Sequence, residues 1–259
     1  MTCTTSRSCC LASISSGSTG RAKASDRILD FQPYIRTLEI AGCPIRFFYA
    51  TAQAASWYDP LSDKNRGELE WLIANIGFGG QKIIDAGAYH GLYTAVFAKA
   101  AGDHGHVVAV DPVPSNRAVI EVNLAINGLR GRIEDCVVSN TEGAIGFSHH
   151  SCGHIVPRGG IRLPSRRLSS ILPDATIVKL DIEGAEFEVV PDQIDELPGA
   201  RVWIVEIHPG RGRDPGRVLE AFRTRPFDLW WGDPSTEQIT PYRAQPWKTR
   251  NTLIAIRHD

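Results

Sequence analysis

The sequence predicts an α/β protein in which helices cover both faces of a mostly parallel β-sheet. From residue 82 onward, short apolar segments of strand length alternate with segments in which apolar residues recur at helical spacing. The segment IIDAGAYHGLYT, residues 83–94, has the layout of a strand that ends at an acid, a turn with two glycines and the start of a helix. Alternation of this kind is typical of parallel sheets, whose strands are connected by helices.

The first 66 residues do not share this rhythm. Residues 1–25 are rich in Ser and Thr and poor in large apolar side chains, which predicts a disordered tail. The tail also has basic residues and no acid before Asp26, as a transit peptide would, but a plain tail is the preferred interpretation. Residues 26–66 form a predicted N-terminal extension, in which a hairpin around Gly42 is followed by a loop with two aromatic residues.

The predicted main domain covers residues 67–259 and begins with a helix at 67–78. The expected strands are 82–85, 106–111, 132–139, 176–181, 200–208, 227–231 and 251–257, and the further expected helices are 91–101, 112–128 and 215–224. A proline at the start and Gly128 at the end bound the second of these three helices. We expect the last two strands to form an antiparallel pair at an edge of the sheet.

The bulk properties of the chain disfavour several classes of protein. Its 259 residues carry a formal net charge of -1, so no basic excess attracts a nucleic acid. No apolar run reaches the roughly 18 residues that a membrane-spanning helix needs. The six cysteines include no Cys-x-x-Cys pair, which disfavours a disulfide framework and predicts a cytoplasmic protein. The oligomeric state is not readable from the sequence, and a homodimer is one option.

Acidic residues mark the ends of the predicted strands. Ligands of open α/β sheets bind beyond the carboxyl ends of the strands, so these positions are the first candidates for a functional site. Four strands end in an acid or next to one, and a fifth carries an acid and a histidine. The residues are Asp85, Asp111, Asp135 with Cys136, Asp181, and Glu206 with His208.

The glycine turn helps to distinguish between two cofactors. A dinucleotide-binding turn has the pattern Gly-x-Gly-x-x-Gly, whereas this turn has Asp85, Gly87 and Gly91. The helix start attracts an anionic group, but the acid at position 85 disfavours a pyrophosphate beside it. S-adenosylmethionine (SAM) suits the site better, since it carries an ammonium group, a sulfonium and a carboxylate. Asp111 could accept ribose hydroxyls from either cofactor. Two rival functions stay open: an NAD-dependent oxidoreductase and a non-catalytic SAM-binding partner subunit.

Three segments resemble the FkbM-type SAM-dependent methyltransferases of class I. They are IIDAGAYHGLYTAVFAKA, VVAVDPVPSNRAVIEVNLAINGL and IVKLDIEGAEFEVV, and the resemblance covers roughly residues 68–208. It implies a seven-strand Rossmann-like sheet and methyl transfer to a hydroxyl of a sugar, glycan, polyketide or other natural product. The turn departs from the family pattern at Tyr89, where the family often has Asn, and at His90.

The resemblance also implies roles for individual residues. Asp85, Gly87 and Gly91 would face the methionine part of SAM, with Tyr89 and Thr94 in the same cofactor site. Asp111 would hold the ribose, Asn116 and Asn123 match polar positions of the family, and Asp135 and Cys136 would border the adenine. The product of the cofactor would be S-adenosylhomocysteine, and Asp181 would begin the acceptor side.

Methyl transfer to an alcohol requires removal of a proton of very high pKa, so a base or a metal ion must assist. The candidates are Lys179, Asp181, Glu183, Glu186, Glu206 and His208. His208 is the preferred base because an imidazole titrates near neutral pH. Asp181 and Glu206 could orient it, or could bind a divalent cation together with it, although a metal ion is not the expected outcome. The alternative for Glu183 and Glu186 is a helix N-terminus, where the helix dipole favours acids.

Several residues are candidates for binding the acceptor. The segment 148–157 holds His149, His150, Cys152 and His154, and an acceptor-binding loop with His154 is preferred over a zinc site because no distal ligand pair exists. Glu183, Trp57 and Tyr58 complete the predicted acceptor site, with Trp230 and Trp231 as further stacking candidates. Core packing is the alternative for these aromatic residues.

Overall fold

The computed structural model describes residues 31–59, 63–148, 153–156, 158–209, 214–233, 238–245 and 251–258. Residues from Pro33 onward form one compact unit. The predicted tail lies outside the described residues, and so do His149, His150 and Cys152. The proposed division into an extension and a main domain at residue 66 stays a prediction.

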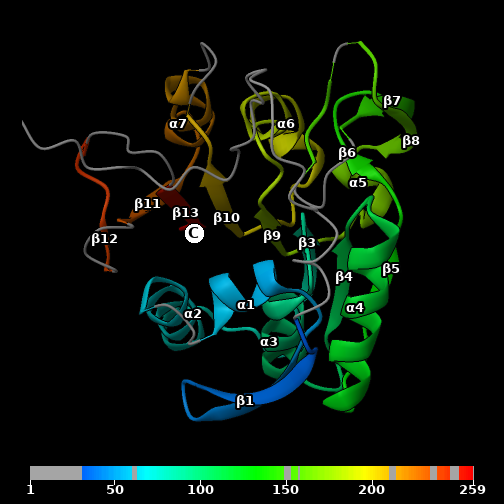
Figure 1. Ribbon diagram of the computed structural model, residues 1–259. Helices are drawn as coiled ribbons and strands as arrows, with labels where there is room; N and C mark the ends of the chain where they lie inside the picture. The colour runs from blue at the N-terminus through cyan, green and yellow to red at the C-terminus, as the bar shows by residue number, and fades with distance from the viewer. Residues whose placement is uncertain are drawn as a thin grey trace, which may run out of the picture. The chain divides into compact units, whose positions relative to one another are not determined.

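An eight-stranded sheet forms the centre of the protein (Figure 1). Its strands, in spatial order, are β12 (Ile239–Pro241), β11 (Phe227–Gly232), β13 (Asn251–Arg257), β10 (Val202–Ile207), β9 (Ile177–Leu180), β3 (Lys82–Ala86), β4 (His106–Val110) and β5 (Arg132–Glu134). The five strands from β10 to β5 are mutually parallel, and β13 runs against them. The mostly parallel sheet inferred from the alternating pattern is therefore confirmed.

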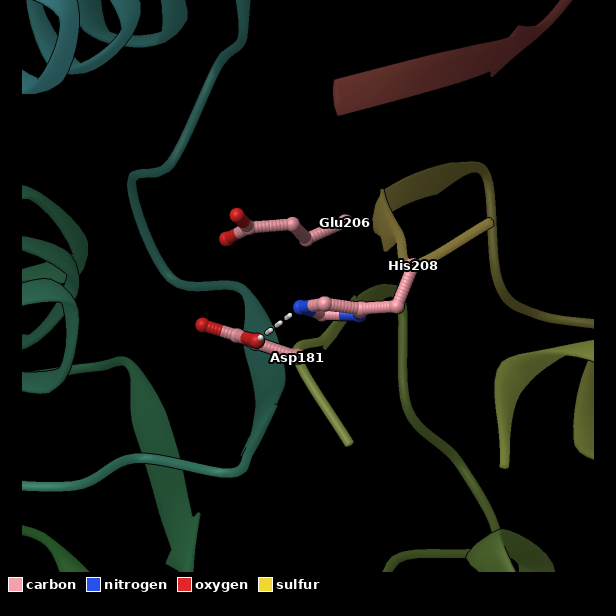
Figure 2. A group of neighbouring side chains, drawn as sticks. All are labelled: Asp181, Glu206 and His208. Atoms are coloured by element: carbon pink, nitrogen blue, oxygen red, sulfur yellow. Dashed lines mark ion pairs between the residues drawn. The ribbon is translucent and has the colours of Figure 1, made fainter. Parts of the chain in front are cut away.

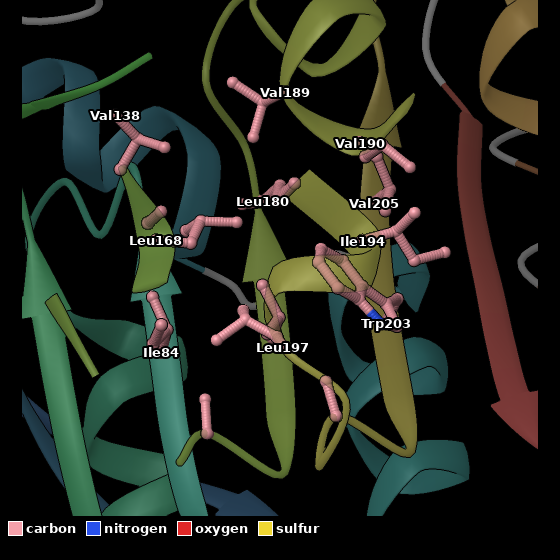
Figure 3. Packing of buried hydrophobic residues seen from close by; sticks show 14 of the residues in the cluster. Ile84, Val138, Leu168, Leu180, Val189, Val190, Ile194, Leu197, Trp203 and Val205 are labelled. Atoms are coloured by element: carbon pink, nitrogen blue, oxygen red, sulfur yellow. The ribbon is translucent and has the colours of Figure 1, made fainter. Parts of the chain in front are cut away.

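Helices cover both faces of this sheet. One face carries α2 (Asp63–Asn75), α3 (Leu92–Ala101) and α4 (Pro114–Ile126), and the other carries α5 (Leu168–Ile171), α6 (Glu186–Gln193) and α7 (Pro215–Arg223). Successive strand residues point to opposite faces, so Ile83 packs with α3 and α4 whereas Ile84 packs with α5 and α6. Figure 3 shows Ile84 of β3 and Leu180 of β9 near Leu168 of α5, in the hydrophobic core on the face that α5, α6 and α7 cover.

The N-terminal hairpin predicted around Gly42 is present. It consists of β1 (Tyr34–Ile40) and β2 (Cys43–Tyr49), which pair antiparallel. The helix α1 (Ala52–Tyr58) follows where a loop was expected. The hairpin is held to α4 by Asn123, which accepts from the Phe48 N–H at 2.7 Å, and by Asn127, which accepts from the Arg46 N–H at 2.8 Å.

Three details of the sheet differ from the sequence prediction. The expected strand 132–139 is two strands, because β5 joins the main sheet while β6 (Val137–Val138) joins a small sheet with β7 (Gly143–Phe147) and β8 (Ile161–Arg166). The late strands β11 and β13 do pair antiparallel, but the three-residue strand β12 forms the edge. This extra strand makes eight where seven were expected.

Across the part of the chain described, no helix has the length and apolarity to span a membrane.

Candidate active site

The register of three strands places the predicted site residues side by side at the carboxyl end of the sheet. Asp85 of β3 pairs with Lys179 of β9. One step beyond the last β9–β10 pair, which joins Leu180 to Val205, come Asp181 and Glu206. Because the carboxyl ends of parallel strands lie on the same side of the sheet, residues that are far apart in the chain lie close together here.

The carboxylate of Asp85 is fully buried and already matched by partners. Its Oδ1 lies 3.2 Å from the ammonium nitrogen of Lys179, and its Oδ2 accepts a hydrogen bond from the Thr94 hydroxyl at 2.6 Å. The sequence predicts a negative charge from Asp85 at the mouth of the turn, whereas in the structure the ammonium group of Lys179 compensates this charge. Contact of Asp85 and Thr94 with the cofactor stays a prediction.

Lys179 keeps its charge although it is buried. Burial alone would lower the pKa of this lysine, but Asp85, Asp181 and Glu206 oppose that effect, so the pKa is raised above its ordinary value. Its ammonium also lies 4.8 Å from the centre of the Tyr93 ring. Lys179 therefore acts as a counter-ion inside the site, which disfavours it as the catalytic base.

Gly87 is required by a neighbouring strand. Its φ is +76°, and a Cβ built at this position would lie 1.8 Å from the carbonyl oxygen of Asp181. The sequence predicts that this glycine allows close approach of a ligand, whereas the close approach seen in the structure is to β9. The glycine turn and the residue that follows β9 are therefore in contact, which places the predicted cofactor turn against the predicted acceptor side.

The start of α3 offers an anion-binding end. Gly91 caps this helix with a φ of +77°, no side chain caps its first turn, and that turn contains no acid. Free amides at a helix start are a favourable place for a carboxylate such as that of SAM. The fit supports the predicted position of the methionine part.

Asp111 ties the turn to the next helix. Its carboxylate accepts from the Tyr89 N–H at 2.9 Å, the Val113 N–H at 2.8 Å and the Asn116 side-chain amide at 3.2 Å. Burial raises the pKa of Asp111 to about 7, against the hydrogen bonds from Val113, Asn116 and Tyr89, which lower it. Asp111 and Asn116 thus form one unit at the position expected for the ribose, and their contact with the cofactor stays a prediction.

The two unusual residues of the turn are both buried. Tyr89 has a φ of +51°, which is uncommon for a residue with a side chain, and its ring lies 5.0 Å from that of Trp57 and 6.4 Å from that of Tyr58. These three residues form an aromatic cluster beside the glycine turn. His90 is 3% exposed, and burial lowers its pKa to about 4. The structure thus gives both departures from the family pattern a packing role.

The remaining predicted residues lie in different environments. Asp135 is exposed between β5 and β6, whereas Cys136 is buried in the core beside α5 and α6, and burial raises the pKa of its thiol to about 12. Trp231 is buried, which agrees with the packing alternative, and Trp230 is partly buried. His154 lies next to the small sheet, where its N–H donates to the Ser148 hydroxyl at 2.9 Å. The proposed roles of Asp135, Cys136 and His154 stay predictions.

Several carboxylates lie around His208, and Figure 2 shows two of them, Asp181 and Glu206. Its Nε2 lies 3.5 Å from Asp181 and 3.9 Å from Glu183, and its Nδ1 lies 3.3 Å from Glu186. One ligand atom each of Asp181, Glu206 and His208 lies within 4.8 Å of the others. The structure thus brings together all three residues predicted to be catalytic, with the predicted acceptor residue Glu183 beside them.

The acids around His208 favour its charged form. Burial alone would lower the pKa of His208, but the hydrogen bond to Glu186 and the charges of Asp181, Glu186 and Glu206 prevail and raise it to about 9. At pH 7 the imidazole is therefore protonated when no other cation is near. A simple general base at position 208 would first have to lose this proton.

A known protein family matches much of this sequence. The sequence model of the FkbM methyltransferase domain matches residues 85–229, which is more than half of the chain. This chain belongs to the FkbM methyltransferase family. As a member of the family it is a SAM-dependent methyltransferase, and this assignment overturns the NAD-dependent alternative.

Solved methyltransferase structures resemble this FkbM methyltransferase to different degrees. The 16S rRNA N2 methyltransferase of T. thermophilus, solved with AdoMet and guanosine, aligns with a TM-score of 0.53 at 16% identity, over 89% of this chain and 52% of its own. A SAM-dependent O-methyltransferase from Thermotoga maritima aligns with a TM-score of 0.47 at 16% identity, over 86% of this chain and 77% of its own. The search of curated proteins found no match.

The sequence names Glu186 as a candidate base, but it does not show that Glu186 and Glu68 support this site. Glu186 is fully buried and accepts from the backbone N–H of His208 at 2.8 Å, so it anchors the histidine, although a helix-start acid was an equally good interpretation. Glu68 of α2 accepts from the Tyr93 and Thr252 hydroxyls at 2.8 and 2.6 Å. In the sequence, Glu68 stands out only as an acid among apolar residues of a predicted helix. Its partners, Tyr93 and Thr252, could not be predicted, because they come from distant segments that folding brings together.

Proposed function

We propose that this FkbM methyltransferase transfers the methyl group of SAM to a hydroxyl oxygen of a small-molecule natural product, sugar or glycan. The observation that supports the proposal is the group of Asp181, Glu206 and His208, which lies in contact with the glycine turn through Asp181. An alcohol must lose a proton during transfer, and a group of carboxylates around an imidazole provides proton acceptors at that position.

The charge of the site favours a neutral acceptor. Four carboxylates, those of Asp181, Glu183, Glu186 and Glu206, surround His208. A nucleic acid would bring phosphates toward this negative region, and the net charge of -1 offers no compensating attraction. A small hydroxylated molecule meets no such repulsion.

The proposed roles divide the site into a cofactor half and an acceptor half. In the cofactor half, the first turn of α3 binds the carboxylate of SAM, and Asp111, held by Asn116, binds the ribose. In the acceptor half, Asp181, Glu206 and His208 face the hydroxyl, and the aromatic cluster with Trp57 and Tyr58 borders the methionine end. We also propose a cytoplasmic location, because the six cysteines include no Cys-x-x-Cys pair and disfavour a disulfide framework.

The acceptor atom can be identified with labelled cofactor. The protein is incubated with ¹³C-methyl SAM and a panel of hydroxylated sugars and natural products, with Mn²⁺ and with EDTA in parallel, and NMR of the product shows whether carbon is attached to oxygen or nitrogen. We expect an O-methyl product. His208→Ala should retain SAM binding by calorimetry and lose turnover by more than about a hundredfold. An N-methyl product, or full turnover by His208→Ala, would refute the proposal.

A further inference from the structure

The buried carboxylate of Glu186 contacts both the backbone N–H and the ring of His208 and so orients this histidine. Glu186 is fully buried, its Oε1 accepts from the His208 backbone N–H at 2.8 Å, and its Oε2 accepts from the Gly184 N–H at 2.7 Å. The same Oε1 lies 3.3 Å from Nδ1 of the ring. When a bound cation displaces the second ring proton, a carboxylate that holds one ring nitrogen as N–H leaves a lone pair on the other, which is how proteins orient histidines that bind metal ions.

The free ring nitrogen points at carboxylates and not at a hydrogen-bond donor. The Nε2 of His208 is buried without a hydrogen bond among the described residues. It faces the carboxylate of Asp181, and the side chain of Glu206, from β10, lies near both (Figure 2). The three ligand atoms lie within 4.8 Å of one another. Neighbouring ligands of octahedral Mg²⁺ are about 3 Å apart and opposite ligands about 4 Å, so small side-chain rotations bring all three into range.

A further carboxylate lies close to the ring nitrogen of His208. Glu183 lies 3.9 Å from Nε2 and adds a further carboxylate, while the nearby ammonium of Lys179 is already paired with Asp85. Glu183 has a φ of +52°, a strained conformation that is typical of functional sites. A divalent cation brings two positive charges to this region, and oxygen ligands with one imidazole suit Mg²⁺ or Mn²⁺.

We infer that Asp181, Glu206 and His208 bind one divalent cation, Mg²⁺ or Mn²⁺. The site itself stands on the geometry of these side chains, and its role in the reaction rests on the function proposed above. A cation here would supply Lewis-acid chemistry that lowers the pKa of a bound hydroxyl. In this arrangement His208 is a ligand, and the partly exposed Glu183, whose carboxylate lies 3.9 Å from Nε2, is available to accept the proton.

The site can be tested without measuring activity. Mn²⁺ is titrated into the full-length protein, with and without S-adenosylhomocysteine, and free Mn²⁺ is followed by electron paramagnetic resonance. We expect one saturable site in the wild type. Asp181→Asn, Glu206→Gln and His208→Gln preserve side-chain size and should each weaken Mn²⁺ binding by more than about tenfold.

Glu188→Gln provides the matched control. Glu188 is an exposed acid in the first turn of α6, so its variant loses one charge near the site without touching the proposed ligands, and its affinity for Mn²⁺ should equal that of the wild type. Circular dichroism confirms that each variant is folded. Absence of saturable binding in the wild type in both states, or equal binding by wild type and all three ligand variants, overturns the inference.

The two proposals fail in different ways. A protein that binds Mn²⁺ through these ligands but methylates nitrogen would refute the hydroxyl acceptor and leave the cation site standing. A protein that methylates a hydroxyl at full rate in EDTA and shows no Mn²⁺ binding would refute the cation site and leave the acceptor standing.

Discussion

Gly87 shows how a single residue joins the two halves of the active site. A methyl group at this position would lie 1.8 Å from the Asp181 carbonyl oxygen, so the turn and β9 could not both keep their places. Gly80 is a matched comparison, since its φ of +71° is similar and its Cβ position is open. The two glycines therefore separate the cost of backbone conformation from the cost of contact.

We expect Gly87→Ala to lower the free energy of unfolding by about 3 kcal/mol or more, because overpacking adds to backbone strain. Gly80→Ala should cost about 1 kcal/mol, which is the backbone effect alone. Urea denaturation of both variants gives the comparison. Equal losses would show that the contact with Asp181 is absent.

His90 makes stability depend on pH. Burial lowers its folded pKa to about 4, below the ordinary value of 6.5, so the unfolded state binds more protons in this interval and stability is lost as the pH falls. Between pH 7 and pH 5 the loss should be about 2 kcal/mol. His90→Gln cannot titrate, so the difference in unfolding free energy between the two pH values should shrink by this amount. An unchanged difference would contradict the buried neutral histidine.

Asp111 makes cofactor affinity depend on pH in its proposed role. Its pKa of about 7 means that the carboxylate, which accepts ribose hydroxyls, is present above pH 7 and is lost below it. We expect the affinity for S-adenosylhomocysteine to fall between pH 8 and pH 6 by up to about tenfold per unit below 7. Calorimetry should show a smaller dependence for Asp111→Asn. The same dependence in both proteins would remove Asp111 from the ribose site.

The hairpin and α4 illustrate how elements fix the site from outside it. Asn123 is fully buried; its oxygen accepts from the Phe48 N–H of β2, and its amide donates to the His90 carbonyl at 2.8 Å. The Asn123 side chain of α4 therefore connects this helix to both the N-terminal hairpin and the glycine turn. The hairpin is thus a support for the cofactor turn.

Asn123→Ala should reduce the free energy of unfolding by about 3 kcal/mol, because it leaves the buried His90 carbonyl and the part-buried Phe48 N–H without this partner. Asn127→Ala removes comparable hydrogen bonds to Arg46 at a more exposed position, where water can replace them, and should cost about 1 kcal/mol. Chemical denaturation measures both. A larger loss for Asn127→Ala would contradict the bridging role of Asn123.

At the scale of the whole molecule, SAM binding couples to the stability of the sheet. The turn, Asp111 and Asp181 all lie at the carboxyl ends of central strands, so the folded unit from Pro33 onward presents the site only when β3, β4 and β9 are assembled. A ligand that binds the folded state alone must raise its stability.

At one hundred times its dissociation constant, SAM should stabilise the protein by about 2.7 kcal/mol. For a domain of this size, that corresponds to an increase in melting temperature of about 5–10 °C. Differential scanning fluorimetry should show this increase with SAM and no increase with NAD. An equal shift with NAD would contradict the cofactor assignment.

The fold class, the family and the cofactor could be predicted from the amino-acid sequence alone. These depend on local features, since hydrophobic periodicity is set by the geometry of one helix or strand and the turn after β3 is a single short segment. The same reasoning located the strand ends and therefore named Asp181, Glu206 and His208. It could not detect β12, because three residues carry too little pattern.

The contacts that each of these residues makes could not be predicted before the strands were placed side by side. The sequence shows an acid at position 85 and a lysine at 179, but the register of β3 against β9 makes them an ion pair and removes a free charge from the cofactor argument. The contact of Gly87 with Asp181 and the hold of Glu186 on His208 likewise join distant segments. Electrostatic energies fall with distance and rise with burial, so the chemistry of these residues depends on neighbours that only folding supplies.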